Sequence, residues 1–191
     1  MNRRDALSRV ALILGGTIIG AEAFLSGCKN TSHPKSLADA FSLDNIAFLD
    51  EVGETILPTT ASSPGAKDAK IGEFMKTIVT DCYEPKDQNT FVEGIGKLND
   101  ASKAKFSKDF MDLSAQQKHD LLVDLDKEAK DYNKKRKEGD PNHYFAMMKQ
   151  LTVWGYFTSE PGATKALRYV PVPGRYEGCI PYKKGDKAWA L

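Results

Sequence analysis

The sequence predicts a mostly α protein, a small irregular helical bundle that ends in an extended arm rich in proline, glycine and aromatic residues. Apolar residues recur at helical spacing in successive segments from residue 41 onward. No segment shows the sustained alternation of apolar and polar residues that indicates a strand. Beyond Trp154, repeated prolines and glycines prevent a long regular helix. The length of 191 residues suits one domain, predicted at residues 41–191.

The composition excludes several classes of protein. With 41% hydrophobic and 28% charged residues, the chain can build a packed core and is not a disordered protein. The 27 basic and 26 acidic side chains nearly cancel, so no overall field favours nonspecific binding of nucleic acid, and no nucleic-acid partner is expected. Three cysteines are too few for a small disulfide scaffold.

Residues 1–27 have the layout of an export signal and are left out of the fold prediction. Arg3, Arg4 and Arg9 precede an apolar stretch at residues 10–25, which is short for a membrane span. That stretch ends in Leu25-Ser26-Gly27-Cys28, which resembles a bacterial lipobox, in which the cysteine is lipidated and becomes the new N-terminus. Cys28 is therefore the expected lipidation site. The alternative is a plain signal peptide that is cleaved near a cysteine.

The adjacent arginines also fit a loose twin-arginine signal, although an ordinary basic region explains them equally well. Residues 28–40 are polar and are predicted to form a lipidated tether between the membrane and the domain. We therefore expect the protein on the periplasmic side of a bacterial cell envelope, anchored to a membrane by lipid.

The first predicted helix begins after Ser42, a good N-cap, and ends at Leu57-Pro58; its apolar stripe consists of Ile46, Leu49, Val52 and Ile56. Residues 59–69 form a loop by composition. A second helix carries one apolar face, which contains Ile71, Phe74, Met75, Ile78, Val79 and Cys82.

A third helix is predicted from Pro85, with Phe91, Ile95 and Leu98 inward, although Gly94 and Gly96 weaken it. Residues 101–112 are lysine-rich and carry no clear signal beyond the apolar anchors Phe106 and Phe110.

A capping box at residues 114–117 starts a fourth helix, whose apolar residues are Leu121, Leu122, Leu125 and Ala129. The basic run at residues 134–137 is explained by the dipole at the end of that helix better than by nucleic-acid binding. Asp140-Pro141 is predicted to start a fifth helix, which carries Tyr144, Phe145, Met148 and Leu151.

The C-terminal arm changes in character after Trp154. A short helix is expected near residues 162–168, and the rest must lie extended over a surface. That surface belongs either to a partner, for which aromatic and arginine side chains are typical anchors, or to the helices of the domain itself.

The sequence offers few residues for chemistry. His33, His119 and His143 have no metal-ligand spacing, and no phosphate loop, dinucleotide motif or haem attachment motif is present, so no cofactor is expected on this chain. In an oxidising compartment, Cys82 and Cys179 are expected to form a disulfide. Two separate buried thiols are the alternative.

Several segments together resemble the small subunit (subunit 3) family of gluconate 2-dehydrogenase. They are residues 48–58 (FLDEVGETILP), 63–66 (SPGA), 81–82 (DC), 151–160 (LTVWGYFTSE), 162–164 (GAT) and 167–179 (LRYVPVPGRYEGC). The resemblance covers residues 41–182, whereas residues 100–112 and 131–139 match no motif.

The resemblance implies a noncatalytic accessory subunit. Its implied partner is the FAD-containing large subunit of a glucose–methanol–choline-type sugar or sugar-acid dehydrogenase, often alongside a cytochrome c subunit. The implied roles are export, maturation and membrane attachment of the flavoprotein. The residues expected to bind the partner are Tyr156, Phe157, Thr158, Glu160, Arg168, Tyr169, Arg175 and Tyr176.

Two other functions stay open from the sequence. A stand-alone surface lipoprotein that binds a ligand or glycan would have a deep pocket lined by Trp154, Trp189 and tyrosines. An enzyme in its own right would use His119 or His143 as a base.

Overall fold

The computed structural model describes residues 36–172, 174–175 and 178–190. The predicted export signal (1–27), the lipidation site Cys28 and the tether as far as residue 35 lie outside the described residues. In chain order the elements are α2 (Leu37–Ala40), α3 (Leu43–Ile56), α4 (Ile71–Cys82), α5 (Pro85–Phe106), the 3-10 turn η1 (Phe110–Asp112), α6 (Ala115–Lys135), α7 (Tyr144–Thr158) and the short π-helix η2 (Gly162–Ala166). Because the described residues contain helices and no strand, the mostly α fold class is confirmed.

The predicted N-caps of two helices are confirmed. The Ser42 hydroxyl accepts a hydrogen bond from the Asn45 amide at the start of α3. At the start of α6, Ser114 and Gln117 form the full capping box: the Ser114 hydroxyl accepts from the Gln117 amide, and the Gln117 side chain accepts from the Ser114 amide. These caps satisfy amide donors that a helix leaves without internal partners.

Two boundaries differ from the prediction. Residues at the end of the predicted tether form α2, where Ser36 caps the turn and Ala40 is buried against the core. The fifth helix begins at Tyr144 and not at Asp140-Pro141. Asp140 accepts a hydrogen bond from the Lys137 amide in the preceding turn, and His143 is the N-cap of α7.

The segment without a clear sequence signal, residues 101–112, contains the last turns of α5 and then η1. Ser107 adopts a left-handed conformation with a φ of 57° and reverses the chain there. The Asn99 side chain holds the reversal, because its oxygen accepts from the Phe110 amide and its amino group donates to Asp109. Phe110 is consequently buried and packs edge-on against Phe48 of α3, with ring centroids 5.3 Å apart.

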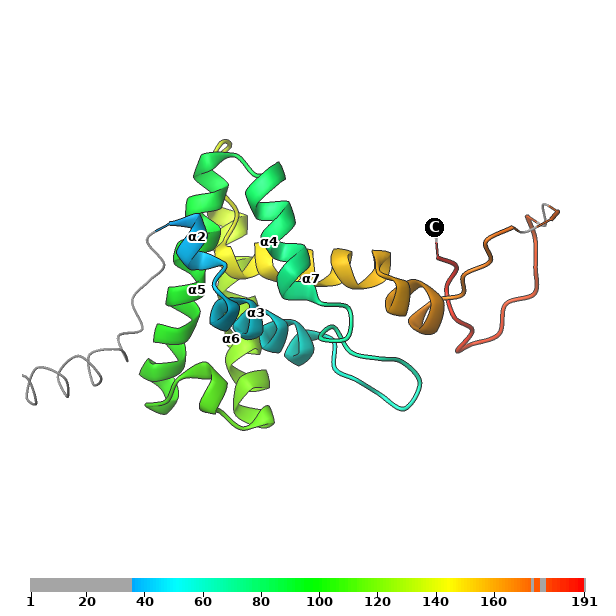
Figure 1. The fold of residues 1–191 in the computed structure, drawn as a ribbon, viewed down its shortest axis with the longest axis horizontal. Helices are drawn as coiled ribbons and strands as arrows, with labels where there is room; N and C mark the ends of the chain where they lie inside the picture. Colours follow the sequence, from blue (N-terminus) through cyan, green and yellow to red (C-terminus); the bar gives the residue numbers. More distant parts are fainter. Residues whose placement is uncertain (1–35, 173, 176–177, 191) are drawn as a thin grey trace, which may run out of the picture. The chain divides into compact units, whose positions relative to one another are not determined.

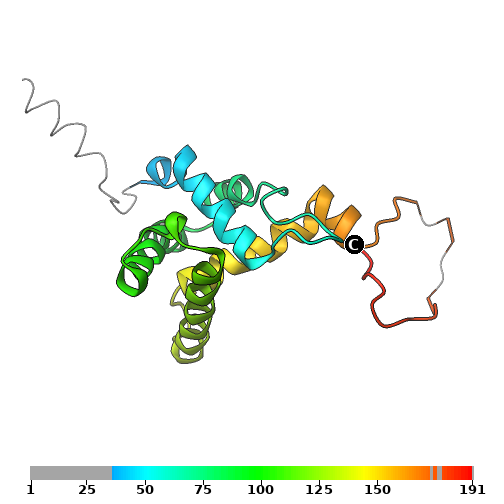
Figure 2. The same ribbon diagram turned by 90° about the horizontal axis from the view of Figure 1, so that it is seen from below.

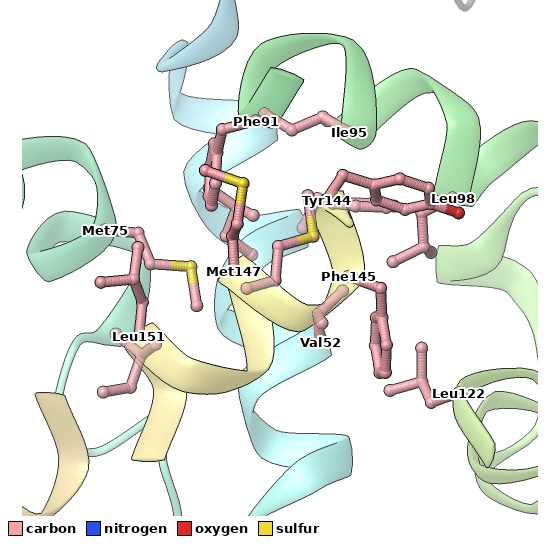
Figure 3. Packing of buried hydrophobic residues seen from close by; sticks show 14 of the residues in the cluster. Val52, Met75, Phe91, Ile95, Leu98, Leu122, Tyr144, Phe145, Met147 and Leu151 are labelled. Carbon is pink, nitrogen blue, oxygen red and sulfur yellow. The ribbon is translucent and has the colours of Figure 1, made fainter. Parts of the chain in front are cut away.

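Helix α7 is the centre of the fold. It packs against α3, α4, α5 and α6, and Figures 1 and 2 show it running between these helices. Figure 3 shows its buried side chains meeting those of the surrounding helices; the labelled residues of α7 are Tyr144, Phe145, Met147 and Leu151. The first half of α7 is therefore a core element, and its last turns lead toward η2 and the arm.

Candidate functional site

The loop between α3 and α4 is fastened to α3 by one carboxylate. Glu54 accepts hydrogen bonds from the amide and hydroxyl of Thr59, at 2.8 and 2.9 Å, and from the amide of Lys67 at 3.0 Å. A β-carbon added at Gly65 would lie 2.2 Å from a Glu54 carboxylate oxygen, so a larger residue there would push the carboxylate away from its hydrogen bonds with Thr59 and Lys67. The motif residues 48–58 and 63–66 thus meet at Glu54.

The same loop is tied to α7 by Tyr156. The Tyr156 hydroxyl donates to the carbonyl oxygen of Pro64 at 2.6 Å, and only 3% of the side chain is exposed. Tyr156 was predicted to bind a partner; the structure places it instead inside the domain, because its ring fills the core and its hydroxyl satisfies a loop carbonyl. The last turns of α7 are therefore held rigidly against the loop.

A close contact between α4 and α7 also holds the last turns of α7 in place. A β-carbon on Gly155 would lie 2.5 Å from the Phe74 ring of α4, so the glycine lets Phe74 approach α7 closely. Phe74 also packs edge-on against Trp154, with ring centroids 5.4 Å apart. One side of the Trp154 ring therefore packs against Phe74, while Trp154 remains 50% exposed to solvent.

These contacts leave an exposed apolar patch on the last turns of α7. Val153, Trp154 and Phe157 are exposed, with 37% of Phe157 accessible, and their spacing along the helix makes them neighbours. Thr158 and Glu160, two of the predicted partner-binding residues, are exposed directly after them. We call these five residues the α7-end surface. Trp154 and Val153 were not among the predicted partner-binding residues, although their helical spacing from Phe157 is visible in the sequence.

An open hollow of about 440 Å³ lies beside Trp154 and Val153, between α6 and α7. On its rim, Asp126 forms ion pairs with Lys149 at 2.6 Å and Lys130 at 2.7 Å. Hydrogen bonds from these two ammonium groups lower the pKa of the Asp126 carboxyl. Trp189 does not line this hollow, so it is not the pocket of Trp154, Trp189 and tyrosines that a glycan-binding protein was expected to have.

The C-terminal arm begins after η2, and the two ends of the arm contact each other at Arg168 and Trp189. Arg168 pairs through its backbone with the chain at Trp189, and its guanidinium lies 4.2 Å from the centroid of the Trp189 ring. Arg168 was predicted to contact a partner; in the structure it is half-buried and engaged inside the arm. Tyr169 and Arg175 are exposed, and Tyr176 lies outside the described residues.

The expected disulfide is not formed in the structure. Cys82 and Cys179 are free and both exposed, so the alternative of two buried thiols is not met either. Cys82 is the last residue of α4. The end of the arm, which follows Cys179, is hydrogen-bonded to Lys165 in η2 and to Arg168 next to η2. These bonds do not bring Cys179 to α4.

The two described histidines have different surroundings. His119 is exposed on α6, and its Nδ1 lies 3.6 Å from Asp120. His143 caps α7: its Nδ1 accepts from the Phe145 amide at 3.3 Å, and its Nε2 lies 3.5 Å from Glu128. Across the part of the chain that the structure describes, no cluster of three histidine, cysteine or carboxylate side chains could hold a metal ion. Nor does any described helix have the length and apolarity needed to span a membrane.

Comparison with known families gives a match over most of the chain. The model of a family described as gluconate 2-dehydrogenase subunit 3 matches residues 44–174. This range includes the three motif segments that meet at Glu54 and Tyr156, the α7-end surface and the start of the arm. No curated protein and no solved structure matches the chain significantly.

Proposed function

Because the chain belongs to the gluconate 2-dehydrogenase subunit 3 family, whose members are accessory subunits of a dehydrogenase complex, we propose that it binds the FAD-containing subunit of a glucose–methanol–choline-type sugar or sugar-acid dehydrogenase. In this proposal the chain carries no redox group of its own. It assists export and maturation of the flavoprotein and attaches it to a membrane, and a cytochrome c subunit completes the complex.

The α7-end surface supports the proposal most directly. Trp154 and Phe157 expose aromatic area to water on a helix end, where burial by a partner is favourable. The surface is rigid, because Tyr156 is bonded to the Pro64 carbonyl and Phe74 packs beneath Trp154. A rigid aromatic surface loses little conformational freedom on binding, which leaves more of the interaction energy for affinity.

Copurification tests the interaction itself. The exported, affinity-tagged chain should retain an FAD-containing protein from native membranes. Replacing both Trp154 and Phe157 by alanine should lower the affinity for that protein by about tenfold or more, as expected for aromatic anchors. Met111→Ala is the matched control, because Met111 is similarly exposed, 46%, but lies in η1.

Two results would count against the proposal. One is the recovery of no flavoprotein with the wild-type chain. The other is an equal loss of affinity in the Met111 control and in the double variant, since the α7-end surface would then have no special part in binding. Thermal unfolding of each variant shows whether the helices remain packed.

Attachment and export are tested separately. Cys28→Ala should release both the chain and the flavoprotein from the membrane fraction, because a lipid anchor would be lost. Replacing Arg3 and Arg4 by lysine should keep the flavoprotein out of the periplasm if it travels with this chain on the twin-arginine route. A flavoprotein that still reaches the periplasm would contradict that route, and one that stays on the membrane without Cys28 would contradict the anchor.

A further inference from the structure

The C-terminal arm is closed on itself at Arg168. The Arg168 amide donates to the carbonyl oxygen of Ala188 at 2.8 Å, and the Ala190 amide donates to the carbonyl oxygen of Arg168 at 2.9 Å. Both backbone polar groups of Arg168 are therefore paired with the returning chain. This is an isolated parallel bridge between Arg168 and Trp189, and the residues between them form a closed loop.

Side chains reinforce the closure. The Arg168 guanidinium lies over the Trp189 ring, 4.2 Å from its centroid, and its Nη2 donates to the Lys187 carbonyl at 3.5 Å. The Lys187 ammonium donates in turn to the carbonyl oxygen of Lys165 in η2. We call Arg168, Lys187 and Trp189 the clasp. A cation held over an indole ring is attracted by the ring's negative face, so the clasp joins the two ends of the loop specifically.

The loop that the clasp closes has no core of its own. Val172 is 81% exposed and Tyr182 is 77% exposed, and no described residue from 169 to 189 is buried. The clasp therefore does not serve to bury apolar surface inside the domain. Its physical effect is to restrict the conformations of a loop that presents apolar side chains to the outside.

The loop is also continuous with the α7-end surface. Only the turn that contains η2 separates Glu160 from Arg168, and η2 packs against α7. Gly162 lies so close to the Tyr156 carbonyl that a β-carbon there would be 1.8 Å from its oxygen. The base of the loop therefore rests on the same rigid turn of α7 that supports Trp154 and Phe157.

The charge of the loop indicates the chemistry of what it contacts. Residues 168–191 contain five arginines and lysines against two acidic side chains. A surface that pairs with the loop should be apolar at its centre and carry carboxylates around it.

We propose that the clasp positions the C-terminal loop as a second binding element, which contacts an apolar surface rimmed by carboxylates on the dehydrogenase subunit. This inference rests on the proposed function. Arg168 and Trp189 are positioning residues: they act through Val172, Tyr182 and the other exposed side chains of the loop. Binding should weaken as salt concentration rises, because basic residues of the loop contribute to it.

The test uses the whole chain and the purified FAD-containing subunit. Trp189→Ala should open the clasp, which raises hydrogen exchange at the Arg168 and Ala190 amides, and should lower the affinity about tenfold. Trp189→Phe keeps a ring under the guanidinium and should restore the affinity to within about threefold of wild type. Tyr182→Ser should lower the affinity without raising exchange at either amide.

A double variant separates positioning from simple contact. If the clasp acts through the loop, Tyr182→Ser should lose most of its effect in the Trp189→Ala background, because the loop is already displaced. Additive effects would overturn the inference, and so would unchanged affinity of Trp189→Ala despite raised exchange. Either result leaves the proposed function intact, provided that the wild-type chain binds. Failure of the wild-type chain to bind overturns both.

Discussion

The N-cap of α7 is His143, and its Nδ1 must be unprotonated to serve as the cap. Nδ1 of His143 accepts a hydrogen bond from the Phe145 amide, which requires an unprotonated nitrogen at that position. The ring is buried and contacts the rings of Tyr132 and Tyr144, with centroids 5.5 and 4.4 Å away. Burial lowers the pKa of His143 below its usual 6.5; nearby Lys97 also lowers it, and Glu128 opposes the shift.

This pKa makes stability depend on pH with a definite sign. Below pH 6.5 the unfolded chain binds a proton at His143 that the folded protein resists, so the free energy of unfolding should fall as pH drops through the lowered pKa. An asparagine side chain caps a helix without titrating, so His143→Asn should flatten this dependence. Urea unfolding of both proteins between pH 8 and about 5 measures the difference, and parallel curves would contradict it.

Side-chain burial at the end of α7 could not be derived from the sequence. Apolar residues occur on every side of this helix, among them Leu151, Val153, Trp154, Tyr156 and Phe157. Helical periodicity identifies a buried face only when the opposite face is polar. Tyr156 is buried because a loop distant in sequence brings the Pro64 carbonyl to its hydroxyl, and Trp154 is exposed because no described element covers its outer edge.

At the scale of elements, a helix crossing explains one of the two glycines in α5. A β-carbon on Gly94 would lie 2.5 Å from the β-carbon of Tyr144, where α5 crosses α7. This atom is fixed to the backbone of α7 and cannot rotate away, so the glycine allows the two helices to approach. The glycine that weakened the sequence prediction of this helix therefore determines how the helix packs.

Gly94→Ala should lower the free energy of unfolding by about 1–3 kcal/mol, because the two helices must separate. Gly96→Ala is the matched control two residues along the same helix. At that half-exposed position alanine should be neutral or stabilise by up to about 1 kcal/mol, through its higher helix propensity. Denaturant unfolding of both variants tests the pair; equal effects would show that the crossing at Gly94 is not critical.

The helices that the sequence predicts well have local signals. α3, α4 and α6 have a cap or a one-sided apolar stripe; the structure starts α3 and α6 at the predicted caps, and α4 contains the predicted apolar residues. The end of α5 and the start of α7 depend on contacts between distant residues: Asn99 binds the Phe110 amide, and Asn133 accepts from the His143 amide. Short-range patterns contain no information about such pairs, so these boundaries could not be predicted.

At the scale of the whole described chain, the stability of the helices should not depend on the C-terminal arm. The described residues beyond Leu167 include no buried side chain, so removal of residues 168–191 should change the free energy of unfolding by less than about 0.5 kcal/mol. The same truncation should lower affinity for the dehydrogenase subunit by about tenfold or more if the loop binds it. Thermal unfolding and a binding assay on one preparation measure both effects.

A longer truncation, which also removes the end of α7, should destabilise the helices. Removal of residues 153–191 also takes away Tyr156 and its bond to Pro64, and should lower the unfolding free energy by several kcal/mol, because a buried aromatic is lost. If the shorter truncation already unfolds the helices, the arm is a cover for its own domain, which is the alternative that the sequence left open.

The central position of α7 has a consequence for the order of folding. α7 is the last α-helix along the described chain, yet α3, α4, α5 and α6 all pack against it. During synthesis α3 and α4 can already pack on each other, but the faces that α3, α4, α5 and α6 turn toward α7 stay uncovered until α7 follows them. Completion of the core must therefore wait for α7, and a product that terminates before Tyr144 would leave four helices with exposed apolar faces, a target for chaperones and proteases.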